Sequence, residues 1–74
     1  MNNRVIELDN RGLQPPEPMM RTLQALKEMD RGGQVIIHND RVPMFLIEEL
    51  RSLKYDYTVD SREDGSAIIT ITKR

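Results

Sequence analysis

The chain has 74 residues, of which 11 are basic, 12 are acidic and none is cysteine. This length predicts one domain, residues 1–74, and the missing cysteine excludes disulfides and Cys-based zinc sites. The formal net charge of −1 argues against nucleic acid or an anionic membrane as a partner. The longest apolar run, Met44 to Ile47, is too short to span a membrane, and the first residues lack a secretion signal, so we expect a cytoplasmic protein.

The first half of the chain predicts a strand, a helix and a second strand. Residues 4–9 contain strand formers at period two, and the prolines that follow suit a first helical turn. A helix is expected over 16–29, with an apolar stripe of Met19, Leu23 and Leu26. The glycines at 32 and 33 are expected to cap its end. The unbroken apolar run in 34–39 indicates a strand inside the sheet.

The second half predicts one more helix and a hairpin. Asp40 is the expected N-cap of a helix over 43–53. Residues 55–61 alternate in polarity and predict a strand, and the Asp64-Gly65 dipeptide predicts a hairpin turn into a last strand over 66–73.

The expected fold class is α/β, more exactly an α+β two-layer sandwich in the order β-α-β-α-β-β. A helical crossover makes the first two strands parallel, and the last two form an antiparallel hairpin. Every strand except the second has one clearly apolar face. We therefore expect a mixed four-stranded sheet with two helices on one face and the other face largely solvated.

A family resemblance lies in the first loop and helix. Residues 8–19, which read LDNRGLQPPEPM, resemble the signature of the TusA/SirA sulfur carriers, in which a strand ending Leu-Asp leads through Arg-Gly-Leu to Cys-Pro-x-Pro. The second half, with Asn39 to Pro43 and the closing hairpin, is similar to an uncharacterised, domain-of-unknown-function branch of that superfamily. That branch carries Pro-Pro-Glu-Pro in place of Cys-Pro-x-Pro.

The resemblance implies that sulfur transfer is absent here. In the carriers, the cysteine lies at the start of the first helix, where free N–H groups and the helix dipole stabilise a thiolate. Pro15 takes that position in this chain and offers no nucleophile. Pro15, Pro16 and Pro18 also lack N–H donors, and Glu17 adds negative charge, so this helix start is a poor anion site. No other catalytic pattern is present, so neither an enzyme nor a cofactor is expected.

The leading functional hypothesis is a non-catalytic domain that docks a partner protein. The superfamily resemblance implies a sulfur, metal-centre or redox context. The loops after the first two strands are expected to converge and to form a rigidly placed binding surface. The residues proposed to contact the partner are Arg11, Gln14, Pro15, Pro16, Glu17 and Arg41.

The alternative hypothesis is a site for a metal ion or small ligand. His38 and Asp40 form a His-x-Asp pair, and Asp9 is a third candidate ligand if the first two strands are neighbours. The competing interpretation is a strand-end histidine beside a helix-capping aspartate. Nucleic acid is disfavoured because only one phenylalanine and two tyrosines are present.

Two surface features stay open in the sequence. Of the methionines, Met20 and Met44 are candidates for exposure, and the pattern does not decide between them. The open sheet face, with Ile36, Ile68 and Thr70, could pair two subunits or form an ordinary monomer surface. The oligomeric state is therefore not predicted.

Overall fold

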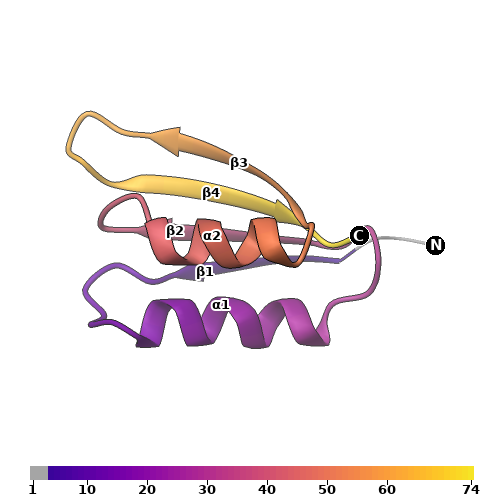
Figure 1. Cartoon of the computed structure of the whole chain (residues 1–74). Coiled ribbons are helices and arrows are strands. Elements are labelled where there is room, and N and C mark those ends of the chain that lie inside the picture. Colours follow the sequence, from indigo (N-terminus) through magenta and orange to yellow (C-terminus); the bar gives the residue numbers. More distant parts are fainter. Residues whose placement is uncertain (1–3) are drawn as a thin grey trace.

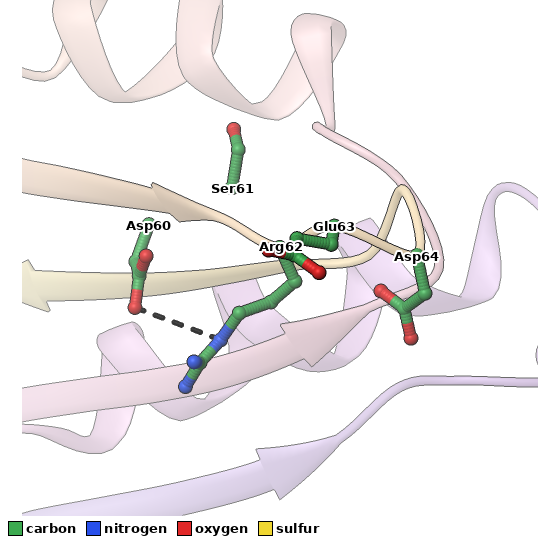
Figure 2. Close-up of a pocket in the computed structure, with 5 residues that line it drawn as sticks. All are labelled: Asp60, Ser61, Arg62, Glu63 and Asp64. Carbon is green, nitrogen blue, oxygen red and sulfur yellow. Dashed lines mark ion pairs between the residues drawn. The ribbon is translucent and has the colours of Figure 1, made fainter.

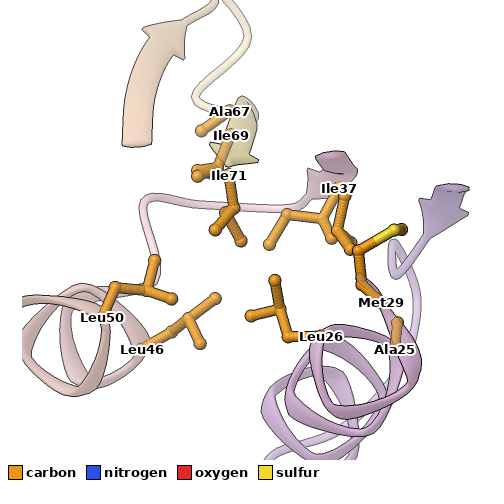
Figure 3. Packing of buried hydrophobic residues seen from close by; sticks show 10 residues of the cluster. Ala25, Leu26, Met29, Ile37, Leu46, Leu50, Ala67, Ile69 and Ile71 are labelled. Atoms are coloured by element: carbon orange, nitrogen blue, oxygen red, sulfur yellow. The ribbon is translucent and has the colours of Figure 1, made fainter. Parts of the chain in front are cut away.

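The computed structural model describes residues 4–74 and has the expected order of elements. Four strands form one sheet in the order β1-β2-β4-β3, and both helices pack on one of its faces (Figures 1 and 3). The fold is therefore the predicted α+β sandwich. Its elements are β1 (Val5–Asp9), α1 (Glu17–Glu28), β2 (Gln34–Asn39), α2 (Met44–Ser52), β3 (Asp56–Ser61) and β4 (Ala67–Thr72).

The strand pairing follows the alternation of apolar residues. β1 and β2 are parallel, whereas β4 is antiparallel to both β2 and β3. Val35 lies opposite Ile6 on one side and Ile71 on the other, and Ile37 lies opposite Leu8 and Ile69 in the same way. Since residues directly opposite each other share a face, these pairs form a continuous apolar layer toward the helices.

The core fills the space between that layer and the helices (Figure 3). Leu26 projects from α1, while Leu46 and Leu50 project from α2, and all three are almost completely buried. No helix within residues 4–74 covers the opposite face of the sheet, and the central residues of that face are only partly buried. No helix in the described part of the chain is long and apolar enough to cross a membrane.

The end of α1 differs from the prediction. The helix ends at Glu28, and its C-cap is Met29 in an extended conformation, so the expected glycine cap is wrong. Gly32, with a φ of +84°, instead lies in the turn that leads into β2. Lys73, directly after β4, holds this turn in place: the Gly32 N–H donates to the Lys73 carbonyl at 2.8 Å, and Lys73 Nζ donates to the Leu26 carbonyl at 2.7 Å.

The start of α2 also differs from the prediction. Its N-cap is Pro43, and no side chain caps the helix. Asp40 was expected to do so, but its Oδ2 accepts a hydrogen bond from the Gly12 N–H at 2.8 Å. The carboxylate therefore joins the two loops and does not cap the helix.

A Schellman motif ends α2. The Tyr55 N–H donates to the Leu50 carbonyl and the Lys54 N–H donates to the Arg51 carbonyl. Lys54 takes the left-handed position with a φ of 62°, where glycine is usual.

Candidate docking site at the loop end of the sheet

Three connections meet at the end of the sheet where β1 and β2 finish. They are the β1–α1 loop, the β2–α2 loop and the β3–β4 turn (Figure 1). The Gly12–Asp40 hydrogen bond joins the first two, and the Asn10 N–H donates to the His38 carbonyl at 2.8 Å. The predicted convergence of the two loops is thus confirmed. We call loop residues 10–16 and 40–43, together with the first turns of α1 and α2 (17–20 and 44–47), the loop corner.

Arg11 is held in one orientation by Asp9. Its Nε and Nη2 atoms contact Asp9 Oδ1 and Oδ2 at 2.8 and 2.9 Å, and its backbone N–H donates to Oδ1 at 3.1 Å. These side-chain and backbone hydrogen bonds hold the pKa of the Asp9 carboxyl well below its usual range. Asp9 in turn raises the pKa of Arg11, and the negative charges of Asp40 and Asp64 add smaller effects. Arg11 is therefore a fixed cation on the surface of the loop corner.

The start of α1 offers little to an anion. Gln14, Pro15, Pro16 and Glu17 are all exposed, as a contact surface requires. The Glu17 N–H donates to the Gln14 carbonyl and the Met20 N–H donates to the Pro16 carbonyl, both at 3.0 Å. Because proline has no N–H, the first turn has few donors left. Pro15 has no side-chain group that can act as a nucleophile.

A buried amide fixes this loop to α1. Asn10 is 1% exposed, and its Nδ2 donates to Thr22 Oγ1 at 3.2 Å and to the Pro18 carbonyl at 3.3 Å. The Asn10 Oδ1 is buried without a hydrogen-bond partner among residues 4–74. Sequence reasoning missed this residue, although an asparagine directly after a strand is a frequent loop-forming signal. The brace makes the first loop part of the folded body.

Exposed apolar side chains lie in the first turns of both helices. Phe45 is 81% exposed, and Met20 and Met44 are each 64% exposed. Both candidate methionines therefore face solvent. Phe45 was not predicted as a surface residue, but helical spacing contains the signal: with Leu46, Ile47 and Leu50 facing the core, Phe45 must point away from it. Arg41 is exposed in the loop just before this turn.

The three candidate metal ligands have different partners. His38 Nε2 lies 3.2 Å from Glu7 Oε1, Asp9 binds Arg11, and Asp40 binds Gly12. Within residues 4–74, no group of three His, Asp or Glu side chains is arranged to hold a metal ion. The structure thus does not bring His38, Asp40 and Asp9 together as one ligand set.

Two shallow hollows lie beside the hairpin turn. One, of about 570 Å³, is lined by residues 60–64 and contains the Arg62–Asp60 ion pair, with Nε 3.6 Å from Oδ2 (Figure 2). The other, of about 300 Å³, is lined mainly by Arg11, His38, Arg62 and Ile68. Because both are open and their guanidinium groups already face aspartates, neither resembles an enclosed small-molecule site.

Comparison with known proteins places this fold in a class. The crystal structure of a SirA-like protein from Desulfitobacterium hafniense superposes with a TM-score of 0.81 and 26% sequence identity, covering 90% of this chain and 95% of that one. The chain thus has a SirA/TusA-like fold. The model of the family described as "Uncharacterized conserved protein (DUF2249)" matches residues 7–73, and the chain belongs to this family. No curated protein matches it.

Proposed function

We propose that the chain is a non-catalytic interaction domain and that the loop corner docks a partner protein. The observation that carries the proposal is the 81% exposed Phe45, adjacent in sequence to the exposed Met44 and close to the cation Arg41. Aromatic residues, methionine and arginine are the types enriched where proteins bind one another. A large side chain held this far out of the core contributes little to the fold.

The rigidity of the loop corner supports the same proposal. Asp9 orients Arg11, Asp40 joins the two loops, and Asn10 ties the first loop to α1. A surface that is already ordered loses less conformational entropy when it binds. The exposed residues Gln14, Pro15, Pro16 and Glu17 extend this surface along the first loop.

We further propose that the partner belongs to a sulfur, metal-centre or redox context, which the sequence resemblance to the TusA/SirA carriers implies. Pro15 and the absence of cysteine exclude a thiol carrier role for the chain itself. A protein of this fold without the thiol can still present the same corner of the molecule. We therefore expect the partner to recognise the shape and charge of the loop corner, without forming a covalent bond to the chain.

Affinity capture with paired variants tests the proposal. The chain is used to capture proteins from extract, and the recovered proteins are quantified by mass spectrometry. Arg41→Glu and Phe45→Ser should each lower recovery of the same protein by about tenfold or more, as expected for central contact residues. Arg31→Glu is the matched control, because it makes the same charge change at an exposed position after α1.

Purified components then decide the outcome. The captured protein should bind the wild-type chain in calorimetry, and Phe45→Ser should weaken that binding while circular dichroism stays unchanged. If Arg31→Glu reduced recovery as much as Arg41→Glu, the loop corner would not be the docking surface. Labelled sulfane sulfur attached to the purified chain and passed to an acceptor would contradict the non-catalytic assignment.

A further inference from the structure

β3 is an edge strand with little cover. Among residues 4–74 it pairs only with β4 (Figure 1). Apart from the half-buried Tyr57, its residues are exposed. Val59 shares the helix-side face with Tyr57 but is 38% exposed. An edge strand presents unpaired backbone groups, which can bind another strand.

The hydrogen bonds of the hairpin show which backbone groups of β3 are available. The Arg62 N–H donates to the Ser66 carbonyl at 2.8 Å, so residue 62 is bonded toward β4. Because the direction alternates along an antiparallel strand, residues 60, 58 and 56 also bond toward β4. The N–H and C=O groups of Tyr57, Val59 and Ser61 therefore point outward from the sheet.

We propose that the outer edge of β3 binds the β3 edge of a second copy of this chain, antiparallel and with Val59 opposite Val59. In this register Val59 pairs with Val59 of the second copy, and Tyr57 pairs with Ser61 of the second copy. Each pair exchanges two backbone hydrogen bonds through the N–H and C=O groups that point outward from the sheet. The two sheets become one continuous sheet, and the two Val59 side chains cover each other on the helix side.

Charge selects this register over its neighbours. If Thr58 lay opposite Thr58 of the second copy, Asp56 of each copy would face Asp60 of the other. If Asp60 lay opposite Asp60 of the second copy, these two carboxylates would meet directly. With Val59 at the centre, Asp56 faces Arg62 of the second copy. Like charges directly opposite each other destabilise a strand pair, whereas opposite charges stabilise it. Both groups are on the open face and within reach. Among residues 4–74, the ion-pair partner of Arg62 is the exposed Asp60 (Figure 2), and that of Asp56 is the exposed Arg74.

Sedimentation equilibrium of the full chain tests the proposal. The mass should rise from 8.6 kDa toward twice that value with concentration, with a Kd between about 1 µM and 1 mM for so small an interface. Asp56→Arg should weaken association by about tenfold, because it removes two cross-strand ion pairs and creates two like-charge pairs. Asp56→Arg combined with Arg62→Asp should restore it, whereas the control Asp30→Arg should leave it unchanged.

Amide hydrogen exchange of the wild-type chain gives a second readout that needs no variant. On raising the concentration, the N–H groups of Tyr57, Val59 and Ser61 should gain protection, while those of Asp56, Thr58 and Asp60 change little because they already bond to β4. A chain that stays monomeric up to about 1 mM overturns the proposal. The proposal is also overturned if the double variant associates as weakly as Asp56→Arg, or if concentration-dependent protection is confined to other strands.

Discussion

Asp9 at the end of β1 and Arg11 in the loop that follows show how two nearby residues set each other's ionisation. The guanidinium contacts both carboxylate oxygens, and the backbone N–H of Arg11 adds a third hydrogen bond. All three bonds favour the ionised carboxylate, which lowers the pKa of Asp9. The pair thus links the end of β1 to the start of the β1–α1 loop at neutral pH.

This contact predicts a pH dependence. The folded pKa of Asp9 lies below the unfolded value of about 3.9, so the stabilising contribution is fully present above that pH and is lost as the pH falls through the folded pKa. Arg11→Gln should raise the pKa of Asp9 toward its ordinary value, measured by NMR titration of the carboxyl carbon. Arg31→Gln is the control and should leave it unchanged; equal Asp9 pKa values with and without Arg11 would contradict the contact.

At the scale of the elements, the helix termini were harder to predict than the strands. Strand faces repeat every two residues, so Ile69 and Ile71 could be assigned to the core from the sequence. The run from Met44 to Ile47 is apolar throughout, and only its helical spacing relative to Leu50 separates the solvent-facing first half from the buried second half. Phe45 was therefore missed because it was considered as part of an apolar run, without regard to which side of the helix it lies on.

The loop contacts could be predicted only in part. That the two loops converge follows from parallel strands ending at one edge of the sheet. That Asp40 binds Gly12 does not follow, because an aspartate before a helix is the usual cap and the competing N–H lies 28 residues away. The partners of the candidate metal ligands could not be predicted either, since Asp9 binds Arg11 and Asp40 binds Gly12.

The Schellman end of α2 predicts a stabilising substitution. Lys54 has a φ of 62°, a conformation that costs a residue with a Cβ about 1 kcal/mol. Lys54→Gly removes that steric cost at a position already shaped for glycine, so the free energy of unfolding should rise by up to about 1 kcal/mol. Urea denaturation measures the change. Lys54→Ala keeps the Cβ and should give no such gain; a gain of equal size there would mean that the charge, not the backbone, is responsible.

At the scale of the whole molecule, one thin layer of side chains holds the fold together. The helices cover a single face of the sheet, so the buried side chains of α1 and α2 meet the strands in one shared core (Figure 3). A chain of this size buries only about 60% of its unfolded surface, so each core residue carries a large share of stability.

This architecture predicts opposite results for two apolar residues of α2. Leu50 is fully buried, and Leu50→Ala should lower the free energy of unfolding by about 2–5 kcal/mol, a large part of a typical total of about 5–15 kcal/mol. Phe45→Ala removes a side chain that is 81% exposed and should change stability by no more than about 0.5 kcal/mol. Urea unfolding of both variants checks this, and a comparable loss for Phe45→Ala would place that ring in the core.

The position of β4 between β2 and β3 has a consequence for synthesis. A ribosome delivers β4 after both of its neighbours, so a nascent chain lacks the middle of its sheet until this segment has left the exit tunnel. Until then β2 and β3 have no common partner, and their unpaired backbone N–H and C=O groups stay open to chaperones and to other unfinished chains. Folding of the complete sheet is thus delayed until β4 has left the exit tunnel.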